Sequence, residues 1–529
     1  MENLIEQAVK NFIKSRSQNS EDLARFKREF SRQHKVKNLS NVSLLSAYHK
    51  LLKTGKIKDN PAIRKLFVKR PVRSLSGIVN ISVLTKPYKC PGACLYCPQQ
   101  SGMPKSYLKG EPAAQRAYDL KFDAAKQVFQ RLEVLSQSGH ATDKIDLRII
   151  GATWSAYPKK YRQDFIKACF AACNVWPNKK VLNKMLALPL EKVQAKNEKA
   201  KHKIIGIAIE TRPDCINVKE IKFLRELGVT KVELGVQSIY DDVLELNKRG
   251  HLSDKTILAT KLLRDAGFKI AYQMMPNLPG SNFRKDLQMF EILFNDSRFQ
   301  PDFLKIYPMA VLKEAPLYKL WKNKKFKSYT LKELSTLLAQ IKCSLPYYVR
   351  VERVIRDIPS QYALNDAAKV TNLRQHILAD LKNNNKVCHC IRCREIKNEE
   401  LKEGTLELFI EKYQAGEGQE FFLSFENKER TKLASLLRLR FSYNQALPEL
   451  KDCALIREVH TYGQQLEVSK KEKSASQHKG LGKKLLEVAQ QVAQKNGYKK
   501  IAVISGVGAR DYYRKFGYKL VGTYMIKEL

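Results

Sequence analysis

The chain has 529 residues, of which 96 are Lys or Arg and 53 are Asp or Glu, so its formal net charge is +43 at pH 7. A hydrophobic fraction of 43% is enough for ordinary cores and excludes general disorder. The sequence contains no apolar run of about 18 residues and opens without a secretory signal, so we expect no membrane segment and a cytoplasmic location. So large a positive charge predicts a polyanionic partner, either nucleic acid or an anionic membrane surface.

The first predicted unit, residues 1–72, is a small basic module. Residues 1–70 hold 17 Lys or Arg against 6 Asp or Glu. Apolar residues recur there at helical spacing, as in Leu4, Ile5, Val9 and Phe12, which predicts helices. Many basic helices only face solvent, but a charge excess over a whole module favours a surface that contacts phosphates.

Short β-rich runs alternate with helical patterns through residues 73–320. This alternation predicts a parallel sheet with right-handed crossovers, in the α/β class. Six repeats predict a partial (βα)6 barrel like that of TIM, with its chemistry at the carboxyl ends of the strands. The predicted strands are 77–85, 144–151, 203–211, 231–238, 268–275 and 303–309, with helices such as 120–137 and 254–266 between them.

Two further units complete the chain. Residues 310–400 have a helical, Lys-rich pattern that ends in a dense cysteine cluster, and we assign 321–400 to a linker. Residues 401–529 have the pattern of a mixed α/β domain. Its predicted strands are 420–426, 433–442, 453–462 and 499–505, and its predicted helices are 481–496 and 508–516.

Six of the eleven cysteines stand in two tight clusters, which suits metal ligation in a reducing compartment better than disulfides. Cys90, Cys94 and Cys97 have C-x3-C-x2-C spacing directly after the first predicted strand. Three thiolates hold a 4Fe-4S cluster and leave one iron open. This spacing resembles the signature of the radical-SAM superfamily, in which the open iron binds S-adenosylmethionine. A zinc knuckle is the alternative, but the sequence has no fourth cysteine nearby to complete such a site.

Polar residues follow the next predicted strands, where they would face the mouth of the barrel. Gly151 resembles the glycine segment that supports the amino group of S-adenosylmethionine, although Ala152 stands where such enzymes carry a second glycine. Glu210, Arg212 and Gln237 follow the third and fourth strands. We expect Gly151, Glu210, Arg212 and Gln237 to contact this cofactor.

A glycine-rich helix start lies in the C-terminal unit, at Gln477, Gly480, Leu481 and Gly482. The free amides and positive dipole end of a helix suit a pyrophosphate. With the strand and the Tyr513-containing helix that follow, this layout resembles the acetyltransferases of the GNAT type. The resemblance implies that the glycine segment binds the pyrophosphate of acetyl-CoA and that a tyrosine lies near its thiol.

Over almost its whole length the chain resembles the catalytic subunit of the Elongator complex, in particular the stand-alone bacterial and archaeal homologues. The resemblance rests on long runs, which are KRPVRSLSG (69–77), ETRPD (210–214), VELGVQS (232–238), MMPNLPG (274–280), LIREVHTYG (455–463) and IAVISGVGARDYYRKFGY (501–518). It implies a tRNA acyltransferase that installs a carboxymethyl group on carbon 5 of the wobble uridine, position 34. In that chemistry a 5′-deoxyadenosyl radical from S-adenosylmethionine activates the acetyl methyl group of acetyl-CoA, which adds to the uridine before the thioester is hydrolysed.

The resemblance also assigns acetyl-CoA contacts and a second metal site. Lys144 and Tyr513 are the expected catalytic residues, and without the resemblance Lys144 would be a solvated strand-edge lysine. The remaining expected acetyl-CoA contacts are Glu458, Val459, His460, Thr461, Leu481, Gly482 and Lys483. Cys388, Cys390 and Cys393 resemble the linker zinc site of the prokaryotic members, with His376 or His389 as candidate fourth ligand.

The expected partners are the anticodon stem-loop of tRNA, with uridine 34 splayed into the site, and an external electron donor. No further protein subunit is expected. One alternative is a lysine or small-molecule acetyltransferase with a structural Fe-S domain. A second, suggested by Ala152, is a tRNA-binding protein with a degenerate radical site. The intact cysteine triplet argues against both.

Overall fold

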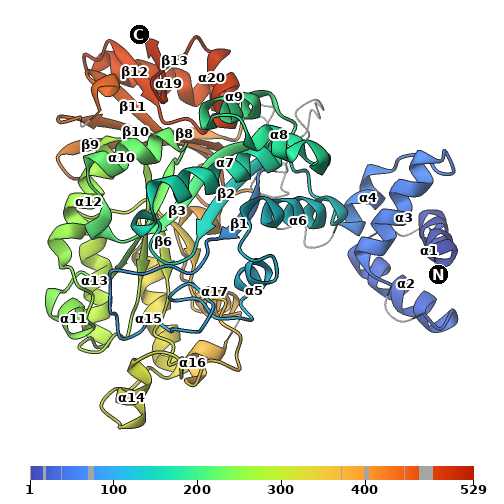
Figure 1. Cartoon of the computed structure of the whole chain (residues 1–529), viewed down its shortest axis with the longest axis horizontal. Helices are drawn as coiled ribbons and strands as arrows, with labels where there is room; N and C mark the ends of the chain where they lie inside the picture. The colour runs from blue at the N-terminus through green and yellow to red at the C-terminus, as the bar shows by residue number, and fades with distance from the viewer. Residues whose placement is uncertain are drawn as a thin grey trace.

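The computed structural model describes residues 2–15, 19–36, 39–68, 77–370, 372–397, 404–445, 447–463 and 480–529. Figure 1 shows a main body with two β-sheets and a helical N-terminal module that stands out from one side of it. None of the helices in these described ranges is both long and apolar enough to span a membrane.

The N-terminal module is helical, as predicted. Its helices pack around a core of its own that includes Phe12, Tyr48 and Phe67. Asn19 and Ser40 cap two of the helices, because their side chains accept hydrogen bonds from first-turn amides. The helices are α1 (Glu2–Lys14), α2 (Ser20–Gln33), α3 (Asn41–Lys53) and α4 (Pro61–Phe67).

The first sheet is an all-parallel, incomplete barrel, which confirms the predicted architecture. Its strands follow one another in chain order, and it has one strand more than predicted. The strands are β1 (Val79–Leu84), β2 (Lys144–Ile150), β3 (Lys203–Thr211), β4 (Lys231–Gln237), β5 (Lys269–Met274), β6 (Phe303–Ile306) and β7 (Arg350–Arg353). The added strand β7 lies within 310–400, the segment whose pattern is helical.

Helices cover the outer face of this sheet, and the largest hydrophobic core lies between them (Figure 1). Alternate residues of β1, such as Val79, Ile81 and Val83, point into that core. The helices from the first sheet to the linker are α5 (Pro112–Asp119), α6 (Ala124–Gln137), α7 (Lys159–Val175), α8 (Leu182–Leu186), α9 (Leu190–Lys199), α10 (Val218–Glu226), α11 (Asp241–Leu246), α12 (Ser253–Asp265), α13 (Phe283–Asn295), α14 (Leu317–Lys322), α15 (Leu331–Ser344), α16 (Asp366–Lys369), α17 (Leu373–Asn383) and α18 (Ile391–Arg394).

The second sheet belongs to the C-terminal unit and has the order β13-β14-β12-β11-β10-β9-β8. Its neighbours are antiparallel except for β11 and β12, which are parallel. Its elements are β8 (Glu407–Gln414), β9 (Gly418–Glu426), β10 (Leu433–Ser442), β11 (Cys453–Thr461), β12 (Lys500–Val503), β13 (Lys519–Val521), β14 (Tyr524–Glu528), α19 (Leu481–Lys495) and α20 (Arg510–Arg514).

Buried ion pairs and close backbone contacts join the two sheets. Asp302, directly before β6, accepts hydrogen bonds from Arg457 of β11 at 2.5 and 2.9 Å, and both residues are fully buried. Gly506, after β12, lies so close to β3 that an added Cβ would be 2.0 Å from the carbonyl oxygen of Ile205. The amino ends of the first sheet's strands therefore rest on the C-terminal unit.

Candidate active site

The cysteine loop follows β1 and faces into the incomplete barrel. Cys94 is buried, whereas Cys90 and Cys97 are half-buried. The Nη1 atom of Arg249 lies 3.5 Å from the Sγ atom of Cys94. The hydrogen bond with Cys97 and the positive charge of Arg249 lower the pKa of the Cys94 thiol and outweigh the effect of its burial. The loop therefore favours a thiolate, the form that binds iron.

The surroundings of this loop fit a cluster with a bound anionic ligand. Arg212 holds Asp214 through two hydrogen bonds of 2.8 and 2.9 Å. Its remaining nitrogen, Nη1, is buried and makes no hydrogen bond with any residue that the structure describes. That nitrogen packs against the cysteine loop, because an added Cβ at Gly92 would lie 2.1 Å from it. A buried donor of this kind fits a carboxylate such as that of S-adenosylmethionine.

The other predicted strand-end residues also gather at this edge. Gly151 has φ +120°, and the following Ala152 has φ +56°, where a side chain is disfavoured. Ala152 thus occupies the left-handed conformation that explains why a glycine is expected there. Gln237 has φ +72° at an irregularity in the pairing of β4 with β5. Positive φ at residues other than glycine often marks a functional site.

Glu210 connects the strand ends to the interior. Its carboxylate accepts hydrogen bonds from Tyr107 at 2.7 Å, Gln273 at 3.2 Å and Lys305 at 3.4 Å. Sequence reasoning did not identify Tyr107, Arg249 or Lys305. A lysine in the middle of a predicted strand, such as Lys305, was the available signal, because such a position is normally apolar.

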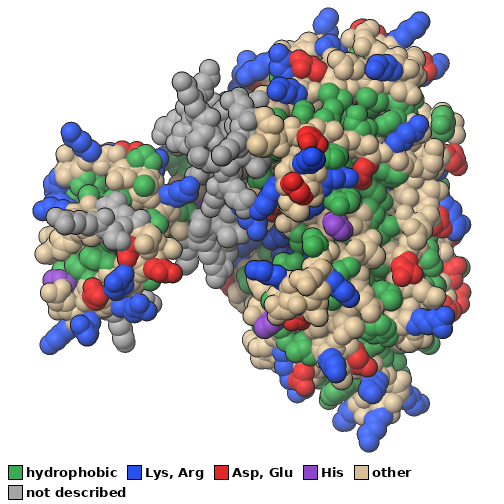
Figure 2. Space-filling view, turned by 180° about the vertical axis from the view of Figure 1, so that it is seen from behind, with side chains coloured by type: hydrophobic (Ala, Val, Ile, Leu, Met, Phe, Trp, Pro, Cys, Tyr) green, Lys and Arg blue, Asp and Glu red, His purple; other side chains and the backbone are tan. Residues whose placement is uncertain are grey.

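A single cavity of about 1180 Å³ occupies the barrel interior. Its lining includes the cysteine loop, Glu210, Arg212 and Gln237 at one end and Glu458 and His460 of β11 at the other. Fifteen of the lining residues are Lys or Arg, and seven are Asp or Glu. Figure 2 shows Lys and Arg side chains in the hollow of the main body next to the N-terminal module. The cavity therefore favours an anionic ligand.

Ion pairs across the interior hold its charged side chains in place. Lys231 pairs with Glu352 at 2.8 Å, and Arg148 pairs with the same carboxylate at 3.1 Å. Burial alone would raise the pKa of Glu352, but Arg148 and Lys231 outweigh it and hold the pKa well below its ordinary value. Lys305 pairs with Glu233 and with Glu210. In ordinary barrels of this kind, branched apolar side chains fill the same space.

Strand β11 lies between the cavity and the predicted pyrophosphate segment at the start of α19. Glu458 and His460 line the cavity, whereas Val459 and Thr461, which alternate with them along the strand, point to the other face. On that other face an added Cβ at Gly482 would lie 3.7 Å from Thr461 Oγ1 and 2.6 Å from the hydroxyl of Tyr512. The residues predicted to bind acetyl-CoA thus lie on both faces of one strand.

The predicted pyrophosphate site is the start of α19. Gly480 precedes the helix with φ +70° and offers no side chain to cap it. The amides of Leu481, Gly482 and Lys483 form the first turn, and amides of a first turn have no acceptor within the helix. Gln477 lies outside the described residues.

Lys144 and Tyr513 belong to different units, and neither of them lines the cavity. Lys144 begins β2 and pairs in register with Lys203 of β3. Lys203 of β3 lies close to the C-terminal unit, because an added Cβ at Gly508 would be 2.7 Å from the Cβ of Lys203. Lys144 therefore begins the strand that neighbours this contact. Burial lowers the pKa of Lys144. Burial raises the pKa of Tyr513, which therefore keeps its proton at neutral pH.

The second cysteine cluster is compact. The sulfurs of Cys388, Cys390 and Cys393 lie within 4.8 Å of one another, the one such group of three His, Cys, Asp or Glu ligand atoms in the described ranges. Neither His376 nor His389 belongs to it. The ring of His389 instead packs on Tyr347, with 4.7 Å between ring centroids. The three sulfurs suit a thiophilic ion such as zinc, but neither predicted histidine joins them as a fourth ligand.

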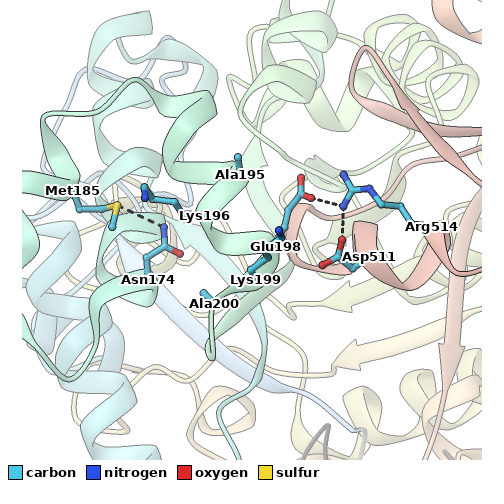
Figure 3. Close-up of a pocket in the computed structure, with 9 residues that line it drawn as sticks. All are labelled: Asn174, Met185, Ala195, Lys196, Glu198, Lys199, Ala200, Asp511 and Arg514. Atoms are coloured by element: carbon cyan, nitrogen blue, oxygen red, sulfur yellow. Dashed lines mark hydrogen bonds and ion pairs between the residues drawn. The ribbon is translucent and has the colours of Figure 1, made fainter.

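Another pocket, of about 830 Å³, lies between α9 and α20 (Figure 3). Glu198 and Arg514 point toward each other across it and pair at 2.5 Å, and Arg514 also pairs with Asp511. None of the predicted site residues lines this pocket. The pocket therefore borders an ion-paired contact between the two units and is not part of the candidate site.

Comparison with known proteins agrees with this layout. Family models described as the Radical SAM superfamily, the Radical_SAM C-terminal domain and the Acetyltransferase (GNAT) domain match residues 84–292, 301–383 and 473–528. The tRNA uridine(34) acetyltransferase of Methanocaldococcus infernus is 40% identical, over 90% of this chain and 91% of its own. Elongator complex protein 3 of Danio rerio is 38% identical, over 87% of this chain and 85% of its own.

A solved structure of the Methanocaldococcus infernus Elp3 that lacks its N-terminus has 37% sequence identity. It covers 86% of this chain and all of its own, with a TM-score of 0.74. The similarity therefore extends through both sheets. The chain belongs to the family of the tRNA uridine(34) acetyltransferases and Elongator complex protein 3.

Proposed function

We propose that this protein is a tRNA-modifying acyltransferase that forms 5-carboxymethyluridine at position 34 from acetyl-CoA and S-adenosylmethionine. The observation that carries the proposal is the single cavity, which extends from the cysteine loop to Glu458 and His460 of the acetyltransferase unit. A reaction that needs a radical cofactor and an acetyl donor in turn requires such a shared space. Comparison with the relatives supports the same reaction, since several are named for uridine 34.

On the radical side, Cys90, Cys94 and Cys97 would hold a 4Fe-4S cluster. When bound, this cluster supplies the electron that cleaves S-adenosylmethionine to a 5′-deoxyadenosyl radical. Arg212 would bind the carboxylate of S-adenosylmethionine through its unpartnered nitrogen. Gly151, Glu210 and Gln237 would position the rest of that cofactor at the strand ends. An external electron donor is part of the proposal.

On the acetyl side, the first turn of α19 would bind the pyrophosphate of acetyl-CoA through the amides of Leu481, Gly482 and Lys483. Gln477 and Gly480 belong to the same proposed segment. Strand β11 would orient the thioester arm through residues 458–461. Lys144, whose pKa is lowered by burial, would act near the acetyl group, and the protonated hydroxyl of Tyr513 would donate a proton to the departing thiolate.

The RNA partner follows from charge. The excess of Lys and Arg around the cavity would attract the phosphates of the anticodon stem-loop, and the basic module of residues 1–72 would add further contacts. We propose the cytoplasm as the location, because the substrate is tRNA, and a chain that acts without other subunits. The proposed division into units is 1–72, 73–320, 321–400 and 401–529, with a structural zinc ion at Cys388, Cys390 and Cys393.

The test is an anaerobic reaction of the cluster-containing protein with tRNA, acetyl-CoA, S-adenosylmethionine and a reductant, followed by mass spectrometry of the digested RNA. We expect 5-carboxymethyluridine and 5′-deoxyadenosine from the wild type and neither from Cys94→Ala. Cys173→Ala is the matched control, because this buried thiol in α7 lies outside the cavity and should leave both products unchanged.

The alternative of an acetyltransferase with a structural Fe-S domain is not favoured, because relatives along the whole chain carry the uridine-modifying name. It would be supported by acetyl transfer to a lysine or small molecule that persists in Cys94→Ala. Binding of tRNA with no 5′-deoxyadenosine would instead contradict the radical step and support an inactive cluster site.

A further inference from the structure

Lys342 of α15 is buried against the second cysteine cluster. Its side chain is fully buried, with 0% exposure. Its Nζ atom lies 3.2 Å from the Sγ atom of Cys388 and 3.7 Å from that of Cys393. The lysine comes from a helix 46 residues before Cys388, so the fold and not the local sequence brings them together.

This contact places a lysine nitrogen, which is normally a charged ammonium, in the buried interior next to two sulfurs. A buried ammonium is costly unless an anion pairs with it. Among the described residues, the groups that act most strongly on the charge of Lys342 are the three cysteines and Arg374, with no carboxylate among them. Its hydrogen bonds go to the sulfurs of Cys388 and Cys393. A nitrogen among three thiolates is also the arrangement of a tetrahedral S3N metal site.

The distances agree with such a site. With metal–sulfur bonds of about 2.3 Å and metal–nitrogen bonds of about 2.0 Å, a tetrahedron has sulfur–nitrogen edges of about 3.5 Å. The two distances from Lys342, 3.2 and 3.7 Å, lie on either side of that value. Among the described residues, neither predicted histidine belongs to the group of three sulfurs, and neither does Cys343, the residue that follows Lys342.

We propose that Lys342 is the fourth ligand of the zinc site, through its neutral amine, with Cys388, Cys390 and Cys393 as the thiolates. Zinc binding then releases the ammonium proton together with the thiol protons. This inference rests on the zinc site proposed above and not on the reaction with tRNA. A chain that binds zinc as expected but makes no modified uridine would therefore contradict the proposed function and leave the ligand assignment intact.

The experiment measures zinc in the full-length protein after the 4Fe-4S cluster is reconstituted, so that the first cysteine loop is occupied. Zinc content is measured by mass spectrometry, and the rate of zinc loss is measured with a chromophoric chelator. Only zinc that disappears in Cys390→Ser is counted for the site. We expect one zinc ion in the wild type and a loss on the order of 10- to 100-fold faster in Lys342→Met.

Three further variants make the result specific. Lys332→Met, on the exposed face of the same helix, should lose zinc at the wild-type rate. Lys342→Cys restores a ligand and should hold zinc at least as long as the wild type, which also guards against a folding defect in Lys342→Met. Lys342→Arg keeps the charge but does not ligate, and it should lose zinc faster than the wild type.

Three results would overturn the assignment. Equal zinc loss from the wild type and Lys342→Met would remove any role for the lysine. Wild-type behaviour of Lys342→Arg would mean that the lysine acts by charge alone. A wild type without zinc, beside a Lys342→Cys variant that binds it, would mean that the lysine replaces the metal.

Discussion

The buried carboxylate of Asp302 should be a main determinant of how the two catalytic units stay together. Both of its oxygens are occupied, by Arg457 at 2.5 and 2.9 Å and by the backbone amide of Ile270 at 2.9 Å, and Arg438 lies at 3.4 Å. In Asp302→Asn the two guanidiniums remain buried and lose one negative partner. Removing one partner from a buried pair costs about 3–5 kcal/mol.

Differential scanning calorimetry measures this cost. At about 2–4 °C per kcal/mol, the Tm of the unit that unfolds first should fall by about 6–20 °C in Asp302→Asn. Asp366→Asn is the control, because among the described residues this exposed side chain forms an ion pair with Lys369 alone, and its Tm should change little. If both variants melted alike, the reasoning about the buried network would be refuted.

The same carboxylate predicts a pH dependence. Burial alone would raise the pKa of Asp302, but Arg457 and Arg438 outweigh it, so the folded pKa lies below the unfolded value. The stabilisation is therefore complete above the unfolded pKa, about 3.9, and is lost as the pH falls toward the folded pKa. The difference in unfolding free energy between wild type and Asp302→Asn should be constant near neutral pH and shrink below pH about 4.

Three other outcomes follow from the site. Gly482→Val should weaken acetyl-CoA binding, because an added side chain would meet the Tyr512 hydroxyl, and should leave S-adenosylmethionine binding unchanged. Calorimetric titration measures both affinities, and an unchanged affinity for acetyl-CoA would contradict the assigned pyrophosphate site. Arg212→Lys should weaken S-adenosylmethionine binding about tenfold to a hundredfold, since a hydrogen bond to a charged group contributes about 1.5–3 kcal/mol. Equal affinity of the variant and the wild type would mean that Arg212 Nη1 makes no hydrogen bond to S-adenosylmethionine. The tRNA dissociation constant, followed by fluorescence anisotropy, should rise on the order of a thousandfold between about 50 and 200 mM salt, and a flat salt response would argue against phosphate contacts around the cavity.

Local patterns were sufficient to predict the parts of the molecule that are contiguous in sequence. The cysteine spacing of residues 90–97 identified the first loop, and alternating strand and helix patterns located the first six parallel strands within a few residues. The glycines at 480 and 482 marked the start of α19. Each of these features is determined by residues that are close together in the chain.

Contacts between distant segments were not predicted, for a physical reason. Strand β7 has four residues, three of them charged, so it shows neither an apolar run nor a clear alternation. The arginines of β10 and β11 would ordinarily face water, yet Arg438 and Arg457 are buried against Asp302. Lys342 likewise gave no local sign of its contact with Cys388. In each case the partner lies on another element, and only the folded chain brings the charges together.

The charged interior explains how one fold can serve two cofactors. Apolar side chains would fill the barrel and separate its two ends. Here Lys231, Glu352 and Arg148 satisfy one another through ion pairs, so the interior can stay polar without leaving isolated buried charges. The pairs leave an excess of positive charge along a continuous cavity from the cysteine loop to β11. Under the proposed function, the acetyl donor and the RNA phosphates are both anionic, and the same field would attract both toward the cysteine loop.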